Sequence, residues 1–397
     1  MKLFFLVSSL DLTQPFSATP AWWQLLKGLY EIGVDVIAAP YQGPAIESLW
    51  WRASDNPAQF YGDTFQSARN VMRRVTPKPG GAPAAKPVTS EESTSDKLVR
   101  QVAQTLIAPL WERELDRVLT KEPDIDAIII LTAPLNHLVG VPSAIMQKHH
   151  KPVIYYDGDV PASLPNMAGF ATGFRIYQGA DVTEYAAFIS NSEGGAEAIK
   201  QLGAKAVHTL FYGADPDVFS PVDVPAQDLD VLFYGHGREY RGEWIDAMIK
   251  APSIELSDKR FAVRGTKLGD LGHTEMLPYL SFSKLREYAC RTKLNLVITR
   301  MAHASVFASS SSRPFELASM GCCMVGNPYL GVERWFEPGR EIFIVNSAEE
   351  ALDRYRYLLS HENERRAAGI AARERVLKEH TFRHRASELV GIVQNYL

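Results

Sequence analysis

A glycine-rich segment in the second half of the chain is suited to holding phosphate. Residues 235–242 read Gly-His-Gly-Arg-Glu-Tyr-Arg-Gly and stand between an expected strand and an expected helix. Gly235 and Gly237 would let the backbone approach a ligand closely, and the helix start supplies free N–H groups. Arg238 and Arg241 carry guanidinium groups that grip phosphate oxygens in pairs. The segment indicates a diphosphate site, and a solvated turn with two surface arginines is the alternative.

A second constellation begins with four serines, Ser309–Ser312, which continue into Arg313, Pro314, Phe315 and Glu316. Serines ahead of a proline are typical of a helix start. Glu316 would lie in the first turn, where its carboxylate could accept hydrogen bonds from two vicinal ribose hydroxyls. Alternatively, Glu316 only caps its own helix and complements the helix dipole. That alternative explains neither Arg313 nor the diphosphate-like segment upstream.

Further candidate catalytic groups follow other expected strands. Asp157 and Asp159 come directly after a buried strand. Such a carboxylate could act as a general base on a substrate hydroxyl, orient that hydroxyl, or cap the next turn. His137 also follows a strand and is either a catalytic candidate or a structural histidine. His303 lies in the loop that leaves the strand expected at Leu294–Ile298, where it could approach a bound nucleotide.

These residues need a scaffold, and the first half of the chain supplies a clear pattern for one. Short apolar runs alternate with helical patterns, which predicts a parallel sheet covered on both faces. The aromatic-rich residues 49–61 are either a platform for a sugar or core packing. The expected strands are Leu3–Ser8, Asp35–Pro40, Ala127–Thr132 and Pro152–Tyr156, and the expected helices are Ala21–Ile32, Asp96–Leu119 and Pro142–His149.

A second alternating unit predicts a second domain. We expect an N-terminal Rossmann-like domain over 1–213, with a flexible Pro, Gly and Ser-rich insertion at 76–95. A linker at 214–228 leads to a C-terminal Rossmann-like domain at 229–378, and a helix within 379–397 could cross back to the first domain. The second unit has expected strands at Val231–Tyr234, Arg260–Val263, Leu294–Ile298 and Cys322–Gly326, and expected helices from Glu243, at Phe282–Cys290, at Arg313–Met320 and from Ala348.

Composition narrows the function classes. The chain has 397 residues, of which 46% are hydrophobic, and a formal net charge of −4, which argues against a general nucleic-acid binder. Its three cysteines show no metal-ligand spacing, and reduced thiols fit a cytoplasmic protein. The apolar N-terminus reads as a buried strand rather than a signal sequence. No stretch approaches the roughly 18 apolar residues of a membrane span, which leaves only peripheral membrane contact open.

Taken together, the two constellations resemble the donor site of GT-B glycosyltransferases. The resemblance rests on a Gly-rich loop carrying Arg241 followed by Arg-Pro-Phe-Glu-x-x-x-x-Gly at 313–321. It extends to Gly331-Val332-Glu333, to Phe336–Glu341, and to the basic stretch 379–385. The chain is most similar to the CgeB-like, spore-maturation-protein-like branch over residues 185–390. The resemblance implies two Rossmann-like, doubly wound parallel-sheet domains that face a central cleft.

The same resemblance implies roles for individual residues. Arg241 would grip the donor diphosphate, where many relatives have lysine, and Glu316 would bind the ribose. Larger retaining relatives have a further glutamate eight positions before this one, whereas this chain has Ala308 there. Transfer of their retaining mechanism is therefore open. The implied donor-binding residues are Gly235, Gly237, Arg238, Arg241, His303, Arg313, Pro314, Phe315 and Glu316.

The function expected from this resemblance is metal-independent transfer of a sugar from a nucleotide-diphosphate sugar, without a cofactor, to an unidentified acceptor. No metal site is expected, because the Asp-Gly-Asp at 157–159 lies in the wrong domain for a donor metal. A nucleotide-sugar epimerase of the same fold and a non-catalytic nucleotide-sugar-binding protein are the alternatives. A dinucleotide oxidoreductase is disfavoured, because the first strand ends in Ser8-Ser9-Leu10-Asp11 without the glycine pattern.

Overall fold

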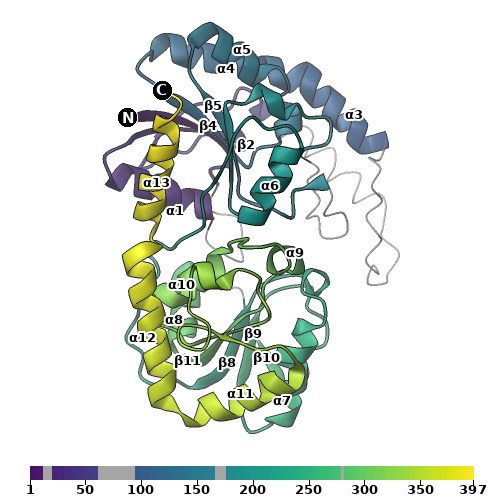
Figure 1. Ribbon diagram of the computed structural model, residues 1–397, viewed down its shortest axis with the longest axis vertical. Helices are drawn as coiled ribbons and strands as arrows, with labels where there is room; N and C mark the ends of the chain where they lie inside the picture. The colour runs from purple at the N-terminus through teal and green to yellow at the C-terminus, as the bar shows by residue number, and fades with distance from the viewer. Residues whose placement is uncertain (12–19, 61–93, 166–175, 279–280) are drawn as a thin grey trace.

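A computed structural model of the protein describes residues 1–11, 20–60, 94–165, 176–278 and 281–397. It consists of two α/β domains that lie one above the other in Figure 1. The segment expected as a flexible insertion at 76–95 lies outside the described residues except for its last two positions, which begin helix α3. Both sheets expected from the alternating pattern are present, and every strand pair in them is parallel.

The N-terminal sheet has seven strands in the order β3-β2-β1-β4-β5-β6-β7. Its central strands are continuous apolar runs because helices cover both faces of the sheet. The strands are β1 (Lys2–Ser9), β2 (Asp35–Gln42), β3 (Arg52–Ala53), β4 (Ala127–Leu131), β5 (Val153–Asp157), β6 (Ala187–Ser190) and β7 (Val207–Thr209). The helices are α1 (Ala21–Glu31), α3 (Thr94–Val102), α4 (Ala108–Lys121), α5 (Val141–His149) and α6 (Glu193–Gln201).

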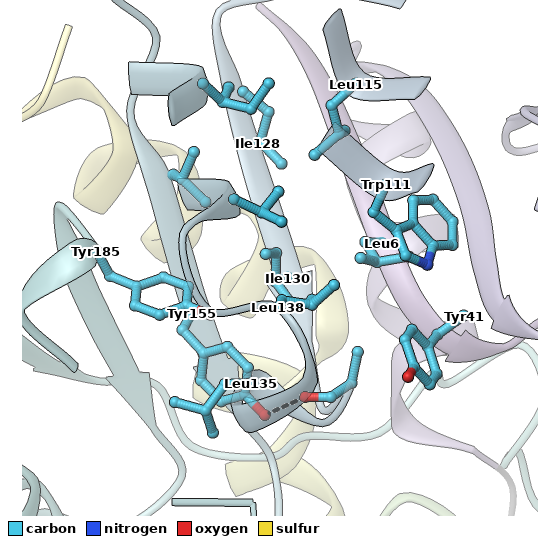
Figure 2. Close-up of a cluster of buried hydrophobic side chains, with 14 of the residues drawn as sticks. Leu6, Tyr41, Trp111, Leu115, Ile128, Ile130, Leu135, Leu138, Tyr155 and Tyr185 are labelled. Atoms are coloured by element: carbon cyan, nitrogen blue, oxygen red, sulfur yellow. Dashed lines mark hydrogen bonds between the residues drawn. The ribbon is translucent and has the colours of Figure 1, made fainter. Parts of the chain in front are cut away.

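One face of this sheet packs against α4 and α5, and Figure 2 shows the resulting core. Trp111 of α4 lies fully buried beside Leu6 of β1. The single polar group of Tyr155, its hydroxyl, donates a hydrogen bond of 2.6 Å to the carbonyl of Ala133. Because the core satisfies this hydroxyl internally, β5 is held rigidly, and the loop that follows β5 has a fixed starting point.

The C-terminal sheet has six strands in the order β10-β9-β8-β11-β12-β13. The strands are β8 (Leu229–Tyr234), β9 (Phe261–Arg264), β10 (Thr274–Met276), β11 (Thr292–Val297), β12 (Met324–Gly326) and β13 (Phe343–Ile344). The helices are α7 (Ala251–Glu255), α8 (Phe282–Cys290), α9 (Met301–Ala304), α10 (Ser312–Ser319), α11 (Ala348–Ser360), α12 (Glu362–Glu379) and α13 (Phe382–Gln394). Short strands β10 and β13 at the two edges were not expected from the sequence.

Helix α12 runs along the C-terminal domain, and α13 then packs against α1 of the N-terminal domain (Figure 1). Leu389 and Val393 of α13 are fully buried in the same cluster as Leu26 of α1. The approach is close, because a Cβ atom on Gly28 would lie 2.6 Å from the carbonyl oxygen of Phe382. The two chain crossings between the domains also touch, since the N–H of Ala214 donates to the carbonyl of His380 at 3.0 Å.

Candidate active site

A cavity of about 370 Å³ opens between the two domains. Its C-terminal wall consists of residues that follow β8 and β11 and the first residues of α10. Its N-terminal wall consists of Gly158 and Asp159, which follow β5, together with Tyr212, which follows β7. The carboxyl ends of both parallel sheets therefore meet at one cavity, which is where open α/β sheets bind their ligands. Its volume is in the range of small-molecule sites.

The glycine-rich loop after β8 is closed around Arg241. The Nε of Arg241 donates to the carbonyl of Ile298 at 3.0 Å, and its Nη1 donates to the carbonyls of Gly237 and His236. A Cβ atom on Gly235 would lie only 2.9 Å from Arg241 Nη2, and Gly237 has a positive φ of 69°. Both glycines are therefore required for this loop geometry. The loop presents Arg241 at the cavity wall.

Arg238, from the same loop, is not at the cavity. Its guanidinium donates to the carboxylate of Asp246 at 2.6 Å and to the carbonyls of Leu268 and Asp270. These contacts join the loop after β8 to the loop after β9 within the C-terminal domain. The structure thus brings Arg241, but not Arg238, to the cavity.

Arg313 and Glu316 form an ion pair in the first turns of α10. Arg313 lines the cavity, lies flat over the ring of Tyr234, and donates to Glu316 Oε2 at 2.8 Å. Glu316 has no exposed surface, and its Oε1 lacks a hydrogen-bond partner among the described residues. Burial raises the pKa of Glu316 above its usual value, although Arg313 opposes this shift. A buried carboxylate oxygen without a donor costs free energy, which a ligand hydroxyl would recover.

Pro314 and Phe315 hold this helix start in place rather than facing the cavity. Phe315 is fully buried, with ring centroids 5.9 Å from Trp335 and 5.5 Å from Phe336. Ser311 is the N-cap of α10 and makes no side-chain capping bond. The N–H groups of the first turn therefore point toward the cavity, which Ser311 and Arg313 line.

An ion pair spans the cavity between the domains. Arg300, which follows β11, donates from Nη2 to Asp159 Oδ1 at 2.6 Å, and both side chains are partly exposed. Both residues also line the cavity. Arg300 was not among the residues expected at the site, yet the rule that ligands bind after strand ends would have indicated it. This pair joins the two walls of the site.

His303 of α9 lies beside this pair, and its ring is 3% exposed. Its Nε2 lies 3.4 Å from Arg300 Nη2, and its Nδ1 has no partner among the described residues. Burial, aided by Arg300, lowers the pKa of His303 to about 3. His303 is therefore neutral at pH 7 and can donate or accept a hydrogen bond, but it cannot supply a positive charge.

Asp157 is not part of the cavity wall. It is fully buried, and its carboxylate accepts hydrogen bonds from Ser163 at 2.5 Å, Tyr177 at 2.8 Å and the backbone N–H of Asp159 at 2.9 Å. Burial raises the pKa of Asp157 to about 6. These contacts shape the loop after β5, so that Asp159 rather than Asp157 faces the other domain.

His137 also lies away from the cavity. Its Nδ1 is 2.7 Å from the hydroxyl of Tyr41, and burial lowers its pKa to about 4. The aromatic-rich residues 49–60 are likewise distant from it, because Leu49 and Trp50 lie at the amino end of β2, whereas the cavity lies at the carboxyl ends. Within the described residues, the site is therefore formed mainly by the C-terminal domain and by Asp159.

The low pKa of His137 gives a testable acid sensitivity. The folded state keeps this ring neutral down to about pH 4, whereas the unfolded chain protonates it below about 6.5. The unfolded state therefore binds more protons between these values, so the free energy of unfolding falls as the pH falls. His137→Asn, which keeps an acceptor for Tyr41, should remove roughly 2 kcal/mol of the loss between pH 7 and pH 5. Urea unfolding at both pH values measures it, and equal losses in variant and parent would contradict it.

Two further structural surveys bear on ligand and membrane contact. Across the described residues, no three or more His, Cys, Asp or Glu side chains gather in a way that could hold a metal ion. None of the helices in the described ranges combines the length and the apolarity that a membrane span requires.

Comparison with known proteins agrees with this geometry. Residues 238–391, which include Arg241, Arg313 and Glu316, match the family model described as glycosyl transferase-like. No curated protein matches the chain.

Several solved structures resemble the whole chain. Sucrose-phosphate synthase from Thermosynechococcus elongatus has a TM-score of 0.64 at 12% identity, with 100% of this chain and 99% of that chain covered. A glycosyltransferase from Rickettsia africae has a TM-score of 0.60 at 9% identity, with 99% and 98% covered. Anabaena HepE in complex with UDP-glucose has a TM-score of 0.59 at 12% identity, with 99% and 100% covered. The chain has the GT-B fold, as expected from the sequence.

Proposed function

We propose that this protein is a glycosyltransferase that moves a glycosyl group from a nucleotide-diphosphate sugar to an acceptor outside the nucleotide. One observation carries the proposal. The cavity has a cationic wall, made by Arg241, Arg313 and the start of α10, that faces Asp159 of the other domain. A diphosphate needs the first wall, and an acceptor hydroxyl needs the second. The family match over 238–391 and the UDP-glucose complex of the similar HepE protein support this assignment.

The leaving diphosphate defines the roles of the cationic wall. Negative charge develops on it as the glycosidic bond breaks. Fixed guanidinium groups and helix N–H groups stabilise that charge most effectively in a cavity with little water. Arg241 and Arg313 supply the guanidinium groups, and the first turn of α10 supplies N–H groups. The proposed reaction therefore does not call on a metal ion, and retention of activity in a chelator such as EDTA tests this.

Glu316 is the proposed ribose acceptor. Because it has no exposed surface, a ribose can reach it only if a covering side chain moves. Arg313 both bonds to Glu316 and lines the cavity, so it is that side chain. A diphosphate that draws Arg313 toward the cavity would uncover Glu316, and ribose hydroxyls would then donate to its oxygens.

Asp159 and His303 serve the reacting sugar and the acceptor. Arg300 fixes Asp159 at the cavity, where its carboxylate orients the acceptor hydroxyl or removes its proton. Neutral His303 supplies a hydrogen bond to the donor sugar or its phosphate. We also propose a hexosyl donor, a place in the CgeB-like branch and a cytoplasmic location, the last because all three cysteines are free thiols.

A panel of nucleotide diphosphates and their sugar conjugates tests the proposed function. A ligand that binds only the folded state raises the melting temperature in proportion to its occupancy. We expect UDP, GDP, dTDP, ADP or CMP, alone or as a sugar conjugate, to raise it at millimolar concentration. No shift with any of these ligands, in a protein that melts cooperatively, would overturn the proposal. NMR of the bound conjugate then separates transfer, which releases nucleotide diphosphate, from epimerisation, which returns an isomer.

A further inference from the structure

All three cysteines of the chain line one cavity that is separate from the candidate active site. This cavity has a volume of about 190 Å³ and shares no lining residue with the cleft. Cys290 is the last residue of α8, and Cys322 and Cys323 lie in the turn that leads from α10 to β12. Cys290 is partly exposed, whereas the other two are buried. Solvent therefore reaches Cys290 first.

Two of these thiols are neighbours, and the third is not. Cys322 Sγ lies 3.7 Å from the carbonyl oxygen of Ala289, the residue before Cys290, and it hydrogen-bonds the sulfur of Cys290. Cys323 points to the opposite face, where it packs in the cluster that contains Tyr355. The structure therefore forms a Cys290–Cys322 pair and leaves Cys323 as an internal reference.

The surroundings of Cys290 stabilise its thiolate. Its sulfur accepts hydrogen bonds from the Cys322 thiol and from the backbone N–H of Val222, and the Arg286 guanidinium lies one helical turn earlier on α8. The hydrogen bond from Cys322 is the largest influence, and together these groups lower the pKa of Cys290 to about 7. The pKa of Cys322 is raised. At neutral pH, a thiolate therefore lies against a thiol.

We infer that Cys290 is a peroxide-reactive thiol and that Cys322 is its resolving partner. The Cys290 thiolate attacks one oxygen of hydrogen peroxide, the O–O bond breaks, and hydroxide leaves and takes up a proton as water. The product is a sulfenic acid at Cys290. Cys322 then attacks that sulfur and loses its proton, the S–O bond breaks, and a second water leaves. One peroxide is thus reduced to two waters while two thiols become one disulfide.

The bond would join two elements of the C-terminal domain that are otherwise in non-covalent contact. It would link the end of α8 to the turn after α10, the helix whose first residues line the active-site cavity. This inference rests on the thiol geometry alone and stands whether or not the proposed transfer reaction is correct. Its test therefore reads thiol chemistry rather than enzyme activity.

Thiol labelling of the parent and of the three single variants Cys290→Ser, Cys322→Ser and Cys323→Ser tests the inference. A maleimide should label Cys290 on the order of tenfold or more faster than the other two thiols. Stoichiometric peroxide should remove two hydrogen atoms from the intact mass, and peptide mapping should find a Cys290–Cys322 bridge that dithiothreitol reverses. Thermal melts confirm that each variant is folded.

The variants separate the two roles. Cys323→Ser should form the bridge like the parent. Cys322→Ser should instead accumulate a sulfenic acid on Cys290 that dimedone traps, and Cys290→Ser should lose both the fast label and the bridge. A bridge that requires Cys323, oxidation that occurs only between molecules, or labelling of Cys290 no faster than that of Cys323 would each overturn the inference.

Discussion

Arg241→Ala should raise the dissociation constant of the nucleotide diphosphate by roughly 10- to 100-fold, because hydrogen bonds to charged groups contribute about 1.5–3 kcal/mol. The transfer rate should fall further, on the order of 10²-fold or more in kcat/KM, because the diphosphate charge grows in the transition state. Arg241 also clamps the carbonyls of Gly237 and Ile298, so part of the loss reflects a looser loop. Isothermal titration calorimetry measures the binding term.

Two variants separate charge from loop geometry. Arg238→Ala removes the same residue type from the same loop but, by its contacts, outside the cavity. It should bind nucleotide within about threefold of the parent, because its contacts with Asp246 and two carbonyls are structural. Arg241→Lys keeps the charge without the fork of carbonyl contacts and should fall between the two. A larger loss of binding in Arg238→Ala than in Arg241→Ala would place the phosphate elsewhere.

Glu316→Gln should abolish the preference for ribose. The substitution keeps the volume of this fully buried side chain but removes its charge and one acceptor oxygen. The parent should bind a nucleoside diphosphate about 10- to 100-fold more tightly than its 2′,3′-dideoxy analogue, because a carboxylate then loses its hydroxyl donors. In the variant, the two ligands should bind about equally.

The comparison of the two ligands protects this prediction against a purely structural effect. Glu316→Gln also breaks the buried pair with Arg313, which lowers stability by an amount that a thermal melt reports. Weaker binding of both ligands by one common factor would mean that Glu316 only supports α10. A ribose preference that survives in the variant would refute the proposed role outright.

The sequence predicted the two parallel sheets because strong apolar runs identify buried strands whatever surrounds them. It also predicted that ligand-binding residues follow strand ends, and this rule located Arg241, Arg313 and His303. The rule applied equally to Arg300, which follows β11 directly, but that residue has no motif of its own. Its significance comes from Asp159, a residue 141 positions away in the other domain.

Neighbouring residues of one type could not be separated from the sequence. Arg238 and Arg241 stand three positions apart in a turn, and only its path through Gly237, at positive φ, sends one to Asp246 and the other to the cavity. Asp157 and Asp159 pose the same problem, because Ser163 and Tyr177 fold back onto the first and leave the second at the cleft. Such choices depend on tertiary contacts, and the local pattern does not contain them.

The packing of α13 on α1 bears on how the protein is made. Arg383 pairs with Glu31 across 352 positions of sequence, and one face of the N-terminal sheet is completed by Phe382, Leu389 and Val393. During synthesis on the ribosome, the first sheet therefore emerges with an apolar face that nothing covers until the last of these residues appears. Such surfaces attract chaperones and favour aggregation. We expect the two domains to mature together, since the first cannot be finished before the second has been translated.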